Sequence, residues 1–274
     1  MSLIFQLLAH CIFLLFLAFT SISLADSKSD FNTWLNSYKK FALKKGISQE
    51  TINVAFENVK FLEQVIKYDR KQPEFIELTE VYVNKRATKK RAQKAKTLYL
   101  QNKKLFDEVE KNFLVDKELL LAFWGIETNF GKYVGKMDIV SSLATLSFDE
   151  RRSAFFSKQL LILLSLVDKK MIEVDALFGS WAGAIGNFQF MPSTIKNYAI
   201  DYDKDGKIDL KKSTKDSVAS AANYIHRMGW KQGAHCYIEV QLNEKIKDKL
   251  VNYSARKISN KLTIRKWEKL VINI

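Results

Sequence analysis

The amino-acid sequence predicts a mainly α-helical fold. Only two prolines and ten glycines occur among the 274 residues, so few positions oppose a helix. Hydrophobic residues make up 47% of the chain, and many recur at the three- and four-residue spacing of a helix face, which predicts a buried helical core. Beyond the first 25 residues Cys236 is the only cysteine, so stability has to come from that core and not from an internal disulfide.

Residues 1–25 have the pattern of a secretory signal peptide. An apolar run through Ile12 to Leu17 is followed by Ser23, Leu24 and Ala25, which is the small-residue pattern of a cleavage site. We therefore expect export and removal of this segment. The alternative is an uncleaved membrane anchor, because the apolar stretch is close to spanning length.

Several helices are predicted in the N-terminal half. Apolar residues recur at helical spacing over 31–42, and Gly46 follows as a stop. Ser48 is expected to be the N-cap of the next helix. Pro73 interrupts the pattern before a long basic helical region over about 74–109.

The next predicted helix carries an isolated carboxylate. We expect Asp116 to cap this helix and Gly131 to end it. Positions 120, 123, 124, 127, 130 and 131 share one face, where Glu127 lies among Leu, Phe and Trp side chains. Desolvation there would raise the pKa of Glu127 toward neutral pH, as a general acid acting on a glycosidic oxygen requires. The alternative is a glutamate at a helix end that bonds to the backbone and has no chemical role.

Shorter elements are predicted in the C-terminal half. Helices are expected over about 151–167, 193–200 and 216–228, with Gly229 closing the last one. Residues 237–242 alternate in the manner of a short strand.

The formal net charge of +14 favours an anionic partner. Much of this charge falls on one predicted helix, at Lys85, Arg86, Lys89, Lys90, Arg91, Lys94 and Lys96. A solvated helix face is the ordinary explanation of such a run, whereas nucleic acid, anionic lipid and acidic cell-wall peptides are the candidate partners. An exported protein rarely meets nucleic acid, so we expect a partner in the cell envelope and no nucleic acid.

Three ordered segments resemble a known family. Gly179-Ser180-Trp181-Ala182-Gly183-Ala184-Ile185-Gly186-Asn187-Phe188-Gln189-Phe190-Met191-Pro192-Ser193 resembles the signature of lytic murein transglycosylases of the membrane-bound B type. Ile126-Glu127-Thr128 followed by Gly131, and Leu143-Ala144-Thr145-Leu146-Ser147-Phe148, are similar to two further family segments. The resemblance begins near Phe31, includes residues 69–75 and continues to Gly233.

The resemblance implies a lysozyme-like helical core with an N-terminal helical region and a short β element near the C-terminus. The expected domain is 26–274, with an N-terminal helical part over 26–110, a lysozyme-like core over 111–235 and an incomplete C-terminal part over 236–274. Family members extend further than this chain, so a C-terminally shortened, catalytically impaired peptidoglycan-binding protein is one alternative.

The implied activity is cleavage of the MurNAc-GlcNAc β-1,4 bond of peptidoglycan without water. Glu127 would protonate the bridging oxygen and then accept the proton of the muramyl C6 hydroxyl, which leaves a 1,6-anhydromuramyl end. This reaction needs one carboxylate, whereas an ordinary glycosidase needs two. Asp138, Asp149, Glu150 and Asp175 could supply a second carboxylate, so a lysozyme-like muramidase that uses water stays an alternative.

The resemblance assigns six further residues to the substrate cleft: Tyr82, Ser180, Gln189, Phe190, Met191 and Tyr224. Ser180 and Gln189 would hydrogen-bond Glu127 or the sugar, and the other four would offer apolar or aromatic walls. As isolated tyrosines, Tyr82 and Tyr224 would be core residues instead.

A candidate ion site follows the glycine-rich segment. Asp201, Asp203, Asp205, Gly206 and Asp209 match positions 1, 3, 5, 6 and 9 of a calcium loop. Position 12 is Lys212 where a sensor would have a bidentate glutamate. The resemblance offers Asp216 as the closing carboxylate and the Lys207 carbonyl as a further ligand. We expect a structural calcium or sodium ion, although an Asp-rich turn without an ion has the same sequence pattern.

No cofactor is expected for the chemistry itself. The resemblance further implies a periplasmic monomer that acts on peptidoglycan glycan strands and meets cell-wall synthesis or remodelling proteins, with inner-membrane anchoring if the signal is uncleaved.

Overall fold

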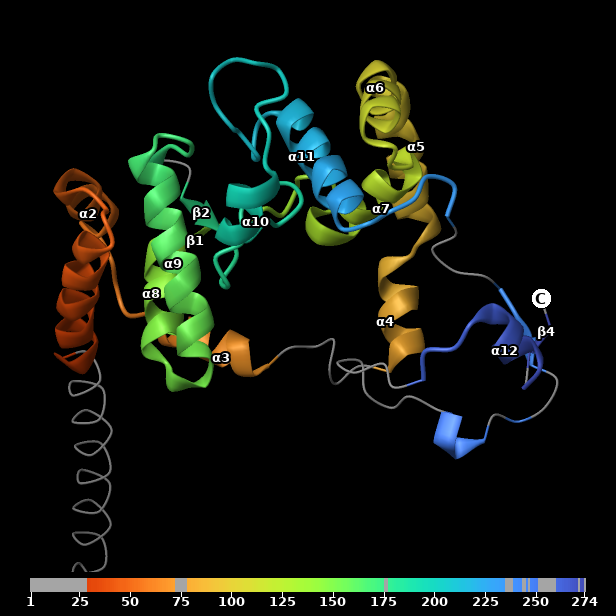
Figure 1. Ribbon diagram of the computed structural model, residues 1–274, viewed down its shortest axis with the longest axis horizontal. Helices are drawn as coiled ribbons and strands as arrows, with labels where there is room; N and C mark the ends of the chain where they lie inside the picture. The colour runs from red at the N-terminus through yellow and green to blue at the C-terminus, as the bar shows by residue number, and fades with distance from the viewer. Residues whose placement is uncertain are drawn as a thin grey trace, which may run out of the picture.

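The computed structural model describes residues 29–71, 78–174, 177–234, 239–242, 245, 247–250, 260–270 and 272–273 (Figure 1). The mainly helical fold predicted from the sequence is confirmed. The signal segment, Pro73, Asp175 and Cys236 lie outside the described residues. Within them, every helix is too short or too polar to cross a bilayer.

The N-terminal elements are residues 29–44, which are helical, followed by α2 (Gln49–Ala55) and α3 (Glu63–Arg70). The predicted N-cap of α2 is confirmed, because Ser48 Oγ accepts a hydrogen bond from the backbone N–H of Thr51 at 3.2 Å. Asp168, from a distant helix, accepts the Thr51 hydroxyl proton at 2.7 Å and ties this part to the core.

The basic region consists of three helices, and the expectation that the cations from Lys85 to Lys96 lie on one helix is wrong. The three helices are α4 (Thr79–Arg86), α5 (Lys89–Gln101) and α6 (Lys103–Phe113). Thr88 Oγ1 accepts from the N–H of Arg91 at 3.3 Å and starts α5, while Asn102 Nδ2 donates to the Leu98 carbonyl at 3.0 Å and ends it. The expected domain division after residue 110 falls inside α6.

The centre of the molecule contains α7 (Lys117–Thr128), α8 (Ile139–Phe148), the short helix η2 (Glu150–Arg152) and α9 (Ser153–Asp168). Residues 139–147 of α8 are all buried, and α9 packs along it (Figure 1). A helix that is buried on every side has no polar stripe, which is why periodicity did not predict α8.

Asp116 stands at the predicted N-cap position of α7, but its side chain does not cap the helix. The carboxylate instead accepts from Trp230 Nε1 at 2.8 Å. The side chain of Glu110 takes over part of the capping by accepting from the N–H of Lys117 at 3.1 Å.

The remaining elements are short. Strands β1 (Met137–Asp138) and β2 (Phe178–Gly179) pair antiparallel, with Met137 opposite Gly179. Helices α10 (Pro192–Tyr198) and α11 (Thr214–Arg227) match two predictions within a few residues. The end of the chain has β3 (Gln241–Leu242), η4 (Asp248–Leu250), α12 (Ile264–Glu268) and β4 (Ile272–Asn273), and β3 pairs antiparallel with β4.

Candidate active site

Glu127 is the penultimate residue of α7, just before a sharp reversal of the chain. Asn129, Phe130 and Gly131 all adopt left-handed backbone angles, with φ of 51°, 61° and 78°. The helix therefore ends at Thr128, three residues before the predicted end at Gly131. The reversal folds the Phe130 ring back against Gly125, where an added Cβ would lie 2.8 Å from it.

The predicted apolar stripe around Glu127 divides between two faces. Leu120 and Trp124 are buried, whereas Phe123 is 43% exposed and Glu127 is exposed. The expectation that Glu127 lies wholly within an apolar stripe is therefore wrong, because α7 packs on the core through its other edge. Partial burial still raises the pKa of the Glu127 carboxyl above its ordinary value.

Phe123 and Glu127 open into a groove of about 270 Å³ between α7, α10 and α11. Its lining consists of Phe123, Glu127, Phe188, Gln189, Phe190, Met191, Thr194, Ala221, Tyr224 and Ile225. Four of the six predicted cleft residues, Gln189, Phe190, Met191 and Tyr224, therefore lie together with Glu127. Glu127 is the only carboxylate among these lining residues.

One wall of the groove is a tight turn built by the glycine-rich segment. Ile185 and Phe190 exchange two backbone hydrogen bonds of 2.9 Å, and Gly186 between them has a φ of 78°. A Cβ at Gly186 would collide with the carbonyl oxygen of Leu210. Gln189 Nε2 donates to the Gly186 carbonyl at 2.9 Å, so the amide is held by its own turn.

A buried polar network supports the groove from beneath. Asn187 Oδ1 accepts from Trp124 Nε1 at 3.0 Å, and the Thr128 hydroxyl donates to the Asn187 carbonyl at 2.8 Å. Asn187 Nδ2 lies within hydrogen-bond distance of the Leu210 carbonyl at 3.2 Å and Ser217 Oγ at 3.1 Å. The network joins the end of α7 to the turn of Gln189, and no pattern in the sequence predicted it.

The other two predicted cleft residues do not line this groove. Ser180 Oγ accepts from the N–H of Ala184 at 2.9 Å and closes the loop after β2. Tyr82 lies on α4, where the Arg86 guanidinium stacks 3.5 Å from the ring centroid.

The rival carboxylates that the structure describes are also away from the groove lining. Asp138 Oδ1 caps α8 by accepting from the N–H of Ser141 at 2.6 Å. Asp149 forms an ion pair with Arg70 at 2.8 Å. Glu150 begins η2 and is exposed.

Five residues that line the groove were not predicted: Phe123, Phe188, Thr194, Ala221 and Ile225. Two of them could have been found from the sequence, because Phe188 lies inside the glycine-rich motif and Phe123 lies four residues before Glu127.

The acidic loop brings three carboxylates together. Ligand oxygens of Asp201, Asp203 and Asp205 lie within 4.8 Å of one another, which fits the oxygen donor set of a hard cation. Asp216 is buried and accepts from the N–H groups of Tyr202 at 2.9 Å and Asp209 at 3.0 Å. Burial raises the pKa of the Asp216 carboxyl, against the lowering effect of these hydrogen bonds.

The predicted ligand Lys207 lies on the same loop, and its backbone N–H donates to Asp205 Oδ1 at 2.9 Å. Its ammonium group forms an ion pair of 3.0 Å with Glu173.

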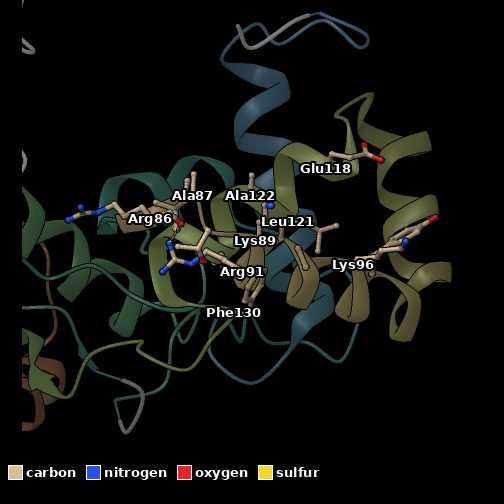
Figure 2. A pocket seen from close by; sticks show the side chains of 15 residues that line it. Arg86, Ala87, Lys89, Arg91, Lys96, Glu118, Leu121, Ala122 and Phe130 are labelled. Atoms are coloured by element: carbon tan, nitrogen blue, oxygen red, sulfur yellow. Dashed lines mark hydrogen bonds between the residues drawn. The ribbon is translucent and has the colours of Figure 1, made fainter. Parts of the chain in front are cut away.

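A larger hollow of about 600 Å³ lies on another side of α7 and does not include Glu127 (Figure 2). The residues that line it include the apolar side chains of Ala92, Ala95, Leu121, Ala122 and Ile126 and the cationic side chains of Arg86, Lys89, Arg91 and Lys96. The smaller groove is the candidate active site, because a carboxylate and the turn of Gln189 converge there.

Comparisons with known proteins show which proteins the chain is similar to. The membrane-bound lytic murein transglycosylase B of Escherichia coli K12 is 41% identical over 120 residues, which cover 43% of this chain and 33% of that protein. A crystal structure of SltB3 from Pseudomonas aeruginosa in complex with NAG-NAM-pentapeptide is similar with a TM-score of 0.76 and 34% identity, over 80% of this chain and 59% of that one. The structure of Escherichia coli Slt35 in complex with calcium has a TM-score of 0.66 at 29% identity, over 76% of this chain and 66% of that one.

The chain thus spans only part of the length of these relatives. The family described as the transglycosylase SLT domain matches residues 30–273, which is most of the sequence. The resemblance found in the three sequence segments is confirmed, and the chain belongs to the transglycosylase SLT domain family.

Proposed function

We propose that this protein is a lytic transglycosylase that cleaves the MurNAc-GlcNAc β-1,4 bond of peptidoglycan and leaves 1,6-anhydromuramyl ends. The observation that carries the proposal is the single carboxylate, with a raised pKa, in a groove whose other lining residues are neutral. The complexes of SltB3 with NAG-NAM-pentapeptide and NAG-anhNAM-pentapeptide support the substrate class by similarity.

In the first step, protonated Glu127 donates its proton to the oxygen that bridges the two sugars. The bond between this oxygen and C1 of the muramyl sugar breaks, and the electron pair leaves with the oxygen. In the second step, the muramyl C6 hydroxyl attacks C1, and the Glu127 carboxylate accepts the hydroxyl proton. Atoms and protons balance without water, and Glu127 returns to its acid form.

Neutral walls suit this reaction. Phe190, Met191 and Tyr224 offer apolar surfaces to the sugars and exclude water that would compete with the C6 hydroxyl. The Phe190 and Tyr224 rings pack edge to face with their centroids 6.2 Å apart, and each ring holds the other in position.

The test is mass spectrometry of the products released from purified sacculi. The unmodified chain is expected to release anhydromuramyl ends, and Glu127→Gln, which preserves the size of the side chain, is expected to release none. Reducing-end muramic acid would instead show a muramidase that uses water. Binding to sacculi without any product would show a wall-binding protein and would contradict the proposal.

We also propose a structural calcium or sodium ion at Asp201, Asp203 and Asp205, with the Lys207 carbonyl and Asp216 completing the site. No cofactor takes part in the chemistry. Calcium is expected to raise the thermal unfolding midpoint of the unmodified chain and to leave that of Asp203→Asn unchanged. If the thermal midpoint is the same in calcium, in sodium and with a chelator, the proposal of an ion at this loop is contradicted.

The location that fits this function is the periplasm, where the chain would act as a monomer beside cell-wall synthesis or remodelling proteins. Cell fractionation and size-exclusion chromatography test these two statements.

A further inference from the structure

Tyr68 of α3 and Trp181 of the loop after β2 form an aromatic pair outside the groove of Glu127. Their ring centroids are 6.4 Å apart, and their planes are inclined by 50°. Tyr68 is 42% exposed and Trp181 is half-buried, so both rings keep accessible surface. Neither lines the groove, and the proposed reaction does not use them.

The backbone connects this pair with the groove in a few short steps. Gln189 lines the groove, and its Nε2 lies 3.3 Å from the carbonyl oxygen of Val134. The next residue, Gly135, lies so close to Gly179 that an added Cβ would collide with the Gly179 carbonyl. Trp181 follows Gly179 by two residues, so the chain from the groove to the pair passes through these two close contacts.

The loop that carries Trp181 is closed by hydrogen bonds and packs on the core. Ser180 N–H donates to the Ala184 carbonyl at 2.9 Å, and Ala184 N–H donates back to Ser180 Oγ at 2.9 Å. Gly183 has a φ of 85°, and an added Cβ would lie 2.5 Å from Leu143 of the buried helix α8. The indole is therefore presented on a closed turn seated on the core.

A buried ion pair fixes the position of Tyr68. The neighbouring residue Asp69 is 1% exposed, and its carboxylate accepts from Arg151 Nε at 2.7 Å and pairs with Arg152. Arg151 Nη2 also donates to the Asp69 backbone carbonyl at 2.7 Å. Burying such charges costs desolvation energy. The ion pairs of Asp69 hold α3 against η2 and so keep Tyr68 facing Trp181.

We propose that Tyr68 and Trp181 form a sugar-stacking platform that binds a pyranose ring of a β-1,4-linked N-acetylhexosamine strand beyond the groove. The flat apolar face of such a ring packs on aromatic side chains, and among the described residues neither the Tyr68 hydroxyl nor the Trp181 indole N–H has a hydrogen-bond partner. The platform rests on the proposed function for its substrate class. It adds a binding position that determines preference for long strands over short ones.

The test is calorimetric binding of N-acetylglucosamine oligomers to the full chain with Glu127→Gln, which removes turnover. In this background, Tyr68→Ala and Trp181→Ala are each expected to weaken hexamer binding by about tenfold and trimer binding by less than about twofold. Trp181→Phe is expected to keep most of the hexamer affinity, because it retains a flat ring. Trp181→Leu, which keeps apolar packing on the core, is expected to lose affinity as Trp181→Ala does.

Phe41→Ala is the matched control, since Phe41 is an aromatic residue with 40% exposure on the N-terminal helix. Equal losses for trimer and hexamer, unchanged hexamer affinity, or absence of hexamer binding to the parent chain would each overturn the platform. Failure of the unmodified chain to release anhydromuramyl ends would overturn the proposed function alone, because oligomer binding is measured without turnover.

Discussion

Glu127 combines two properties that usually exclude each other, an accessible carboxyl and a raised pKa. Aromatic groove walls remove water from one side of the group, and its other side is open to a substrate. A general acid needs both, because the proton has to be present near neutral pH and has to reach the glycosidic oxygen.

The raised pKa of Glu127 has a stability cost that Glu127→Gln should remove. A carboxyl with a higher pKa in the folded than in the unfolded state binds more protons when the protein is folded. The free energy of unfolding therefore falls as the pH rises from the pKa of the unfolded state through that of the folded state. We expect Glu127→Gln to raise the thermal midpoint at pH 7 by about 1–2 °C. The gain should vanish below about pH 4, where both states of the unmodified chain are protonated. Calorimetry over this pH range measures it, and a lower midpoint at pH 7 would contradict desolvation as the cause.

Asn187 is expected to be among the most sensitive residues of the fold. Asn187→Ala leaves the buried Trp124 indole N–H without its acceptor and removes the hydrogen bond from Asn187 Nδ2 to the Lys211 carbonyl at 3.0 Å. We expect a loss of about 3 kcal/mol in the free energy of unfolding, measured by urea denaturation. The control Asn53→Ala removes an exposed amide that bonds only to Gln49 among the described partners, and should cost less than about 0.5 kcal/mol. Equal losses of unfolding free energy in Asn187→Ala and Asn53→Ala would contradict a stabilising role of the buried network.

At the scale of elements, local capping chemistry was predictable only where tertiary contacts did not compete. Ser48 caps α2 as its type and position predict. Asp116 has an equally good sequence signal, but the Trp230 indole occupies its carboxylate. Thr88 and Asn102 divide the basic region through side-chain bonds that a helical periodicity does not reveal.

The same limit applies to the candidate site. Helical spacing identified Glu127 but could not say which side of α7 meets the core, so Phe123 was wrongly grouped with Leu120 and Trp124. The glycine-rich motif led to Gln189, Phe190 and Met191, because these residues are consecutive on one tight turn. Tyr82, by contrast, depends on how α4 is placed, which no local pattern encodes.

Gly186 is expected to be essential for the shape of this turn. Gly186→Ala combines a left-handed backbone angle with a collision against the Leu210 carbonyl. We expect it to lower the free energy of unfolding by more than about 2 kcal/mol and to weaken substrate binding by displacing Gln189. The control Gly229→Ala has a φ of 98° but no atom within 4 Å of the added Cβ, so only the backbone cost of about 1 kcal/mol applies. Similar losses at both glycines in urea denaturation would contradict this assignment.

At the scale of the whole molecule, the formal net charge is +14, and α5 carries five cations and no carboxylate beside the apolar hollow. We expect binding to purified sacculi to weaken as salt rises from about 0.05 M to about 0.3 M, because screening shortens the range of these charges. The double variant Lys89→Glu and Lys96→Glu should weaken binding more than Lys44→Glu with Lys45→Glu, which changes the net charge equally. A salt-independent pull-down, or equal effects of the two double variants, would contradict a role for α5.

The helix α7, which carries Glu127, borders two separate hollows. Ile126 and Glu127 are consecutive, yet Ile126 lines the hollow of about 600 Å³ and Glu127 lines the groove of about 270 Å³. A small apolar molecule bound in this hollow would press on the turn of α7 that carries Glu127.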